Sequence, residues 1–201
     1  MRPTTAFAIA VSVASLAAAP RPAAAAPPGP YDVKSGIIEV KTSSIAGGKD
    51  VVYFDDHGRR EARYSTTSGV IAGQKVETVN VEIRTPEKTY RWDAKKKTGF
   101  ITPGMVPARQ DQAPPDARTR AEYHYKELPD RTIAGKPCTG RSMEMMKGMV
   151  VKSWTWKGIA LRIESGIGTI PVTMEAVKIE VDVPVPPEKF QVPGDVVLKK
   201  L

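Results

Sequence analysis

The sequence predicts a mainly β protein, α+β at most, whose strands form a curved antiparallel sheet. Nearly every segment after the proline-rich stretch 27–30 alternates apolar and polar residues with period two, the pattern of half-buried strands. The alternation changes phase at Lys157-Gly158, as a β-bulge or sharp bend requires. Because a curved sheet needs such an irregularity, the phase change favours a curved sheet over a flat one.

The first half of the chain contains the segments expected to form strands and one clear hairpin. The cluster Asp55-Asp56-His57-Gly58 is rich in turn-forming residues and separates two alternating segments, so it predicts a hairpin turn. The expected strands are 36–42, 51–54, 59–66, 75–84 and 89–93.

The second half begins with a proline-containing segment, 102–116, that we interpret as a loop or a lid. Segment 117–128 is expected to be a short helical turn running into a strand, with Asp116 as a helix cap. Segment 141–156 predicts a hairpin with Lys147-Gly148 at its turn, pairing Met146 with Met149 and Met145 with Val150. Segment 170–183 is expected to be a long strand, and 184–193 an extended tail with its prolines on an edge.

The N-terminus has the features of an export signal. Arg2 precedes an apolar stretch, and the alanine run 23–26 supplies small residues for a signal peptidase. We expect residues 1–25 to be a signal peptide, 26–34 a proline-rich N-terminal joint, and 35–198 a single β domain that is periplasmic or secreted and soluble. An uncleaved membrane anchor is the alternative, although Pro20 and Pro22 interrupt any longer apolar helix.

The charge pattern argues against several classes of partner. The chain has 201 residues with 30 basic and 22 acidic ones, a formal charge of +8, and the two signs are mixed along the sequence. No zinc-finger spacing, aromatic RNA-binding signature or basic helix accompanies this charge, so we expect no nucleic acid as partner. A basic pI of about 9.6 still permits weak attraction to anionic lipid head groups, and hence a peripheral envelope contact.

Residues suited to catalysis or metal binding are sparse. His57 and His124 are the only histidines and neither has a partner at ligand spacing, so we expect neither a metal nor a cofactor. No nucleophile elbow or acid–base pair stands out, which argues against an enzyme. Cys138 is the only cysteine, so no internal disulfide can form, and the thiol is either buried or available for an intermolecular bond.

A methionine cluster near Cys138 raises the question of copper. Thioethers and a thiolate are soft ligands that suit Cu(I). Strand alternation, however, sends Met143 and Met145 to one face and Met146 to the other, so the sulfurs would not converge on one ion. Methionine also fills irregular apolar surfaces, which is the competing interpretation of Met143–Met149.

Four aromatic side chains are our candidate ligand-binding residues. Trp154 and Trp156 point the same way along one expected strand, and Tyr90 and Trp92 do so along another. Together they could line a concave apolar face that holds an acyl chain or a lipid. The alternative is an ordinary sheet core covered by the proline-rich segment.

Several motifs occur in an order that resembles a known family of exported proteins. They are IRTPEKTYRWDAKKKTG (83–99), IAGKPCT (133–139), WTWKGIAL (154–161) and PEKFQVPG (187–194). Over residues 35–198 the chain is similar to uncharacterised exported bacterial proteins of the LolA/LolB-like lipoprotein-carrier superfamily. The resemblance implies an unclosed half-barrel of antiparallel strands with few covering helices here, whose concave side is apolar and binds or senses hydrophobic or lipidated partners.

The leading functional hypothesis is therefore a non-enzymatic periplasmic binding module. It would hold a lipid, an acyl chain or a lipidated protein on the concave face, with Trp92, Trp154, Trp156 and Tyr90 as its wall. The alternative is a structural or envelope-stress interaction domain without a small ligand, and a methionine-rich copper-handling protein ranks third. The ligand's identity and the oligomeric state are left open by the sequence.

Overall fold

The computed structural model describes residues 29–44, 47–71, 73–107, 109, 115–146, 148–167 and 170–201. The expected signal peptide, residues 1–25, lies outside the described residues. Within the described part of the chain, no helix is both long and apolar enough to cross a membrane.

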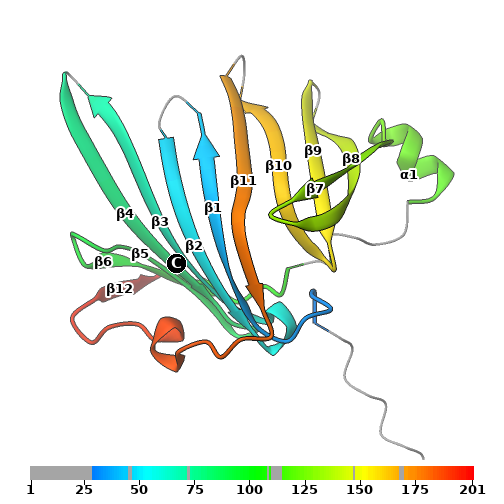
Figure 1. The fold of residues 1–201 in the computed structure, drawn as a ribbon. Helices are drawn as coiled ribbons and strands as arrows, with labels where there is room; N and C mark the ends of the chain where they lie inside the picture. The colour runs from blue at the N-terminus through cyan, green and yellow to red at the C-terminus, as the bar shows by residue number, and fades with distance from the viewer. Residues whose placement is uncertain are drawn as a thin grey trace, which may run out of the picture.

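The described residues form one 12-stranded sheet, in the order β12-β6-β5-β4-β3-β2-β1-β11-β10-β9-β8-β7 (Figure 1). The first six strands are β1 (Gly36–Ser43), β2 (Gly47–Asp55), β3 (Arg60–Ile71), β4 (Gln74–Arg84), β5 (Lys88–Asp93) and β6 (Thr98–Pro103). The others are β7 (Lys126–Ile133), β8 (Lys136–Met146), β9 (Met149–Trp156), β10 (Ile159–Ile167), β11 (Ile170–Val181) and β12 (Val197–Lys200). The two edge strands, β12 and β7, do not pair with each other, so the sheet is an unclosed half-barrel. The predicted fold class, mainly β with a curved open sheet, is confirmed.

Two turns show how far the sequence pattern was correct. The turn at 55–58 is confirmed as the link between β2 and β3, and it contains the short 3-10 helix η1 (Asp56–Gly58). At Lys157-Gly158, where the sequence predicted a bulge or a sharp bend, the structure has a bend: both residues have positive φ, 49° and 82°, and form the tight turn between β9 and β10. The bulge lies beyond it, between Ala160 and Arg162 of β10. A two-residue turn and a bulge both shift the alternation by one residue, so the pattern could not separate them.

The hairpin of β8 and β9 is confirmed, but its register is partly wrong. Met146 pairs with Met149 as expected, whereas Val150 pairs with Glu144 instead of Met145. A bulge between Glu144 and Met146 accommodates the additional residue. The preceding segment behaves as predicted, because helix α1 (Ala117–Glu122) is capped by the Asp116 side chain, which accepts from the backbone N–H of Thr119 at 2.9 Å, and leads into β7.

The C-terminal tail contains more regular secondary structure than the extended chain that we expected. It contains a 3-10 helix, η2 (Pro187–Phe190), and then β12, which pairs in parallel with β6. The hydroxyl of Tyr64 donates to the carbonyl of Lys189 at 3.0 Å, and the Arg60 guanidinium lies 4.6 Å from the centre of the Phe190 ring. These contacts fasten the tail across one face of the sheet (Figure 1).

Both faces of the sheet are therefore covered by apolar packing. The neighbours Tyr53 and Phe54 of β2 point to opposite faces and belong to different clusters. The tail cluster lies beneath the C-terminal tail and comprises Ala62, Val81, Ile83 and Trp92 with Phe190, Val192, Val196 and Leu198 packed against them. The main cluster contains, among others, Val33, Phe54, Cys138, Trp154 and Leu161.

We predict that Cys138 is unreactive in the folded protein. Its side chain is 1% exposed, its thiol donates to the carbonyl of Lys136 at 3.4 Å, and burial raises the thiol pKa. Labelling by a thiol reagent at neutral pH should be slow in native buffer and fast in denaturant, and Cys138→Ser should lower stability without changing the oligomeric state. A second variant with Cys138→Ser and Ser43→Cys, which places a thiol at an exposed site, is the control. Labelling of native Cys138 as rapid as at position 43 would contradict the prediction.

Candidate functional site

A cavity of about 270 Å³ lies on one face of the sheet. Its apolar wall consists of Ile38 and Val40 of β1, Val52 of β2, Leu161 and Ile163 of β10, and Met174 of β11. Arg84 of β4 lines the same space, although β4 and β10 are separated by four strands in the sheet. Side chains from such distant strands can share one cavity only on the inside of the curvature. This face is therefore the concave one, and we call the space the inner cavity.

The segment before β1 and the loop after β6 cover part of this cavity, through Tyr31 and Pro107. The backbone N–H of Tyr31 donates to the carbonyl of His57 at 3.0 Å, and that of Asp32 to Lys157 at 3.1 Å. The Arg109 guanidinium donates to both carboxylate oxygens of Asp32 at 2.5 Å and lowers the pKa of that carboxyl group. The two covering segments are thus fastened to each other.

Two glycines in hairpin turns make room for the covering segment. A Cβ atom at Gly58 would lie 2.4 Å from the Tyr31 ring, and one at Gly158 would lie 2.1 Å from the carbonyl oxygen of Pro30. Both glycines also have positive φ, near 80°, which other residues adopt only with strain. Larger residues at these turns would push the covering segment away from the sheet.

Glu61 of β3 lies at the polar end of the inner cavity and is only 2% exposed. The Tyr31 hydroxyl donates to its Oε2 atom at 2.9 Å. Its Oε1 atom forms an ion pair with Arg84 and lies 3.8 Å from Nη2 of Arg63. Burial, together with the nearby Glu61 carboxylate, raises the pKa of Tyr31 well above its usual range.

These contacts continue across four strands as an alternating row of charges, which we call the charged ladder. Arg63 reaches Asp50 at 3.2 Å, Arg84 reaches Glu82 at 3.3 Å, and Glu82 forms a further ion pair with Arg91. The members of the ladder are Asp50, Arg63, Glu61, Arg84, Glu82 and Arg91. Its three acidic and three basic side chains balance, so the ladder offers no excess charge to an ionic ligand.

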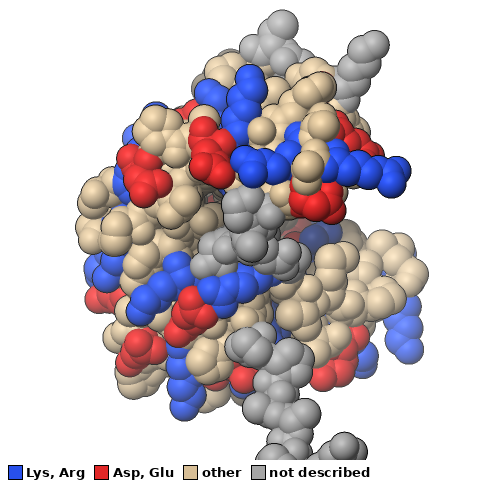
Figure 2. Space-filling view, turned by 90° about the vertical axis from the view of Figure 1, so that its right-hand side faces the viewer, with Lys and Arg blue, Asp and Glu red and all other residues tan. Residues whose placement is uncertain are grey.

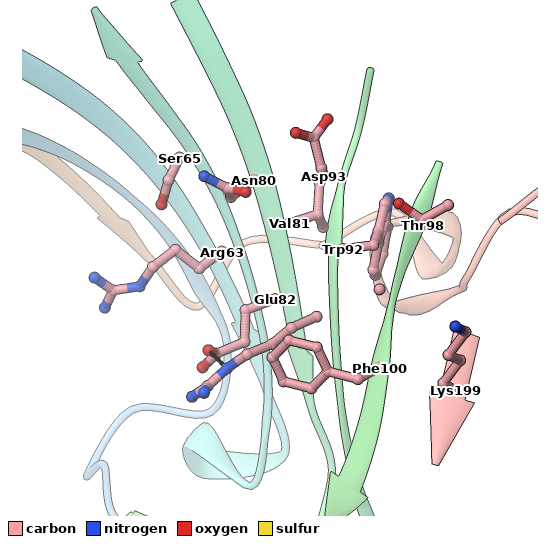
Figure 3. Close-up of a pocket in the computed structure, with 12 residues that line it drawn as sticks. Arg63, Ser65, Asn80, Val81, Glu82, Trp92, Asp93, Thr98, Phe100 and Lys199 are labelled. Carbon is pink, nitrogen blue, oxygen red and sulfur yellow. Dashed lines mark hydrogen bonds and ion pairs between the residues drawn. The ribbon is translucent and has the colours of Figure 1, made fainter. Parts of the chain in front are cut away.

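A second cavity of about 600 Å³, the side cavity, lies at the other end of the ladder (Figure 3). Arg63 lines both cavities. Strand register places Arg63, Glu82, Arg91, Phe100 and Lys199 in succession across the same face. The concave face thus has two cavities with both apolar and polar lining residues, and Arg63 of the charged ladder borders both of them.

The structure does not bring together the four aromatic residues proposed from sequence. Trp92 and Tyr90 belong to the tail cluster, on the convex face, and Trp92 also borders the side cavity. Trp154 and Trp156 belong to the main cluster. Ligand binding by these four residues stays a prediction.

Trp154 lies beneath β7 and is 2% exposed. Its Nε1 donates to the carbonyl of Pro129 at 3.0 Å, and the Arg131 guanidinium lies 4.2 Å from the ring centre. The amines of Lys136 and Lys157 each lie 5.0 Å from the centre of the Trp156 ring. Neither tryptophan lines the inner cavity or the side cavity.

The methionines and Cys138 do not converge either. Met145 and Met146 are 52% and 65% exposed at one end of β8, whereas Cys138 is buried toward the other. Seven extended residues separate Cys138 from Met145, roughly 23 Å at strand spacing. One copper ion could not be shared across that distance.

Sequence reasoning missed the cavity wall and the charged ladder. Ile38, Val40 and Val52 do alternate with polar residues, so the signal for one buried face was present. The sequence carried no signal that β1 pairs with β11, 130 residues further along the chain, which is what closes the wall.

We predict that the bond between Tyr31 and Glu61 stabilises the protein in a pH-dependent way. Tyr31→Phe should cost about 1.5–3 kcal/mol at neutral pH, as for hydrogen bonds to charged groups. Because the folded-state pKa of Tyr31 is raised, this contribution is complete below about pH 10, where an unfolded tyrosine titrates, and is lost as the pH rises further. The gap in unfolding free energy between wild type and variant should therefore narrow as the pH rises above about 10.

Denaturant unfolding at several pH values measures this gap. Tyr123→Phe is the control, since no hydrogen bond of that hydroxyl occurs among the described residues. A gap that stays constant through pH 11, or one no larger than that of the control, would contradict the role given to Tyr31.

The comparisons with known proteins show a shared fold and little shared sequence. No family model matches the chain, and no curated protein matches it by sequence. An uncharacterised conserved protein from Thermus thermophilus superposes with a TM-score of 0.55 and 10% identity, covering 85% of this chain and 92% of that one. MucB gives a TM-score of 0.50 and 10% identity over 82% of this chain, which spans only 60% of MucB.

A putative outer membrane lipoprotein-sorting protein domain from Vibrio parahaemolyticus is also similar, with a TM-score of 0.32, 8% identity, and coverage of 79% of this chain and 89% of that one. Likeness at such identities concerns architecture alone. The comparisons show that this chain shares its fold with the Thermus thermophilus protein and with MucB.

Proposed function

We propose that this protein is a non-enzymatic binding module of the periplasm that holds a lipid, an acyl chain or a lipidated partner in the inner cavity. The observation that carries the proposal is an apolar space on the concave face, walled by four strands and partly covered by two segments. An apolar cavity of about 150 Å³ can hold benzene. The inner cavity, at about 270 Å³, has room for a longer aliphatic group.

The wall of the cavity favours an apolar guest. Val40, Ile163 and Met174 are only half-buried, so water contacts part of their apolar surface when the cavity has no ligand. Covering such surface contributes roughly 25 cal/mol per Å². The balanced ladder at the polar end argues for a neutral guest group rather than a carboxylate or an ammonium.

Native mass spectrometry of protein exported to the periplasm tests the proposal directly. We expect a bound lipid or other apolar molecule that is lost on unfolding. Protein that carries no such molecule, and that also fails to bind an apolar probe, would instead favour the structural interaction domain without a small ligand.

A substitution that fills the cavity should abolish binding without unfolding the protein. Met174→Trp adds volume at a half-buried position of the cavity wall, and we expect the affinity for the neutral dye N-phenyl-1-naphthylamine to fall at least tenfold. Val177→Trp is the matched control, because Val177 lies on the same strand and is 56% exposed. Fluorescence titration and thermal unfolding of both variants make the comparison, and equal dye affinity in the two would contradict this site.

The tryptophans are tested in the same assay. If Trp154 and Trp156 bind the ligand, alanine at either position should greatly reduce dye affinity and lower the melting temperature only slightly. If they are core residues, each truncation should cost about 3–5 kcal/mol of stability and leave the affinity of the folded fraction unchanged. Dye titration and denaturant unfolding of Trp154→Ala and Trp156→Ala distinguish the two outcomes.

A further inference from the structure

Four strand connections lie at the same end of the sheet. They join β1 to β2, β3 to β4, β8 to β9 and β10 to β11, and all four hairpins point toward the top of Figure 1. We call the described residues of the segments 43–48, 69–76, 145–151 and 166–172 the apolar rim. The sequences of these four segments contain two lysines and no aspartate or glutamate, in a chain that is 26% charged.

The turns at the opposite end have the usual composition. The connection of β2 to β3 contains Asp55, Asp56 and Arg59, and that of β4 to β5 contains Glu87. Turns are ordinarily polar because their backbone and side chains face water. The four connections of the rim are therefore less charged than these two turns, although the β5–β6 connection, which points the same way as the rim, contains Lys95, Lys96 and Lys97.

Five apolar side chains of the apolar rim are exposed. Their exposed fractions are 73% for Val70, 65% for Met146, 52% for Met145, 46% for Val150 and 38% for Val76. They come from two hairpins at separate places along the end of the sheet. A single exposed apolar residue is ordinary, but five of them in two hairpins at the same end of a sheet indicate a surface that contacts something apolar.

Two lysines lie close to the end of the hairpin formed by β1 and β2. Lys41 of β1 and Lys49 of β2 are cross-strand partners and share a face of the sheet. Lys49 is bonded to Glu39 at 3.1 Å, while Lys41 has no ion pair or hydrogen bond from its side chain among the described residues. Like charges directly opposite each other destabilise a sheet. Glu175 of β11 lies opposite Lys41 on its other side and offsets part of this repulsion, and the exposed Lys41 can still meet an anionic group from outside.

We propose that the apolar rim docks onto the surface of a lipid bilayer that contains anionic head groups. The exposed valines and methionines enter the boundary between head groups and acyl chains, and Lys41 and Lys49 contact lipid phosphates in the head-group layer. Separate projecting tips suit a fluid surface, which closes around each tip without needing a complementary shape. The absence of acidic residues from the rim sequences also favours an anionic surface over a neutral one.

Flotation with lipid vesicles tests this proposal on the intact protein. We expect binding to vesicles of phosphatidylethanolamine and phosphatidylglycerol, and much weaker binding to phosphatidylcholine alone. The double variant Val70→Glu/Met146→Glu should bind at least about tenfold more weakly, because two apolar anchors are lost and two repelled charges gained. Lys41→Gln should weaken binding to the anionic vesicles and reduce its salt dependence.

The chain provides a closely matched control in Met105→Glu/Val197→Glu. It makes the same chemical change at positions that are 73% and 64% exposed but lie away from the rim. This control should bind vesicles like wild type, and both double variants should keep the wild-type melting temperature and dye affinity, which separates this proposal from that of the inner cavity. Absence of vesicle binding by wild type, or equal losses in both double variants, would overturn the proposal. So would self-association of wild type that only the rim variant abolishes, since the rim would then be an interface between copies of the chain.

Discussion

The buried carboxylate of Glu61 is the interaction on which the concave side depends. Removing a carboxylate from water costs several kcal/mol unless charged and hydrogen-bonding partners replace the water. Here Tyr31 and Arg84 supply those partners, and they come from 30 residues before Glu61 and 23 residues after it. Glu61 thereby connects the covering N-terminal segment to the middle of the sheet. At this end of the inner cavity the charge of its carboxylate is balanced by Arg84.

The two faces and the rim of the sheet differ in the side chains that they present. The charged ladder borders both the inner cavity and the side cavity on the concave face, while the C-terminal tail covers the convex face over β3 to β5. Lysines, arginines and carboxylates are interspersed over the outer surface seen in Figure 2. The apolar rim differs from that background because its segments contain no aspartate or glutamate.

The cavity and the rim are close along the chain. Met174 of the cavity wall is four residues from Ile170, at the tip of the hairpin formed by β10 and β11, and this distance is roughly 13 Å along a strand. If the rim rests on a bilayer and the cavity holds an acyl chain, lipid would have only a short path between the two. The opposite, charged end would then face water, so the polarity of the two ends would orient the protein on the membrane.

The sequence by itself determined most of the strands and turns and the short helix before β7, because period-two alternation, turn residues and a helix cap are local signals. It did not indicate β6 or β12. It predicted that Met146 pairs with Met149 but misassigned Met145, because a bulge shifts the alternation by one residue. Only the tertiary structure decided which face is concave, that β12 pairs in parallel with β6, and that Glu61 meets Tyr31 and Arg84. Alternation states which residues share a face, but strand pairing across 130 residues decides which of those faces encloses a cavity.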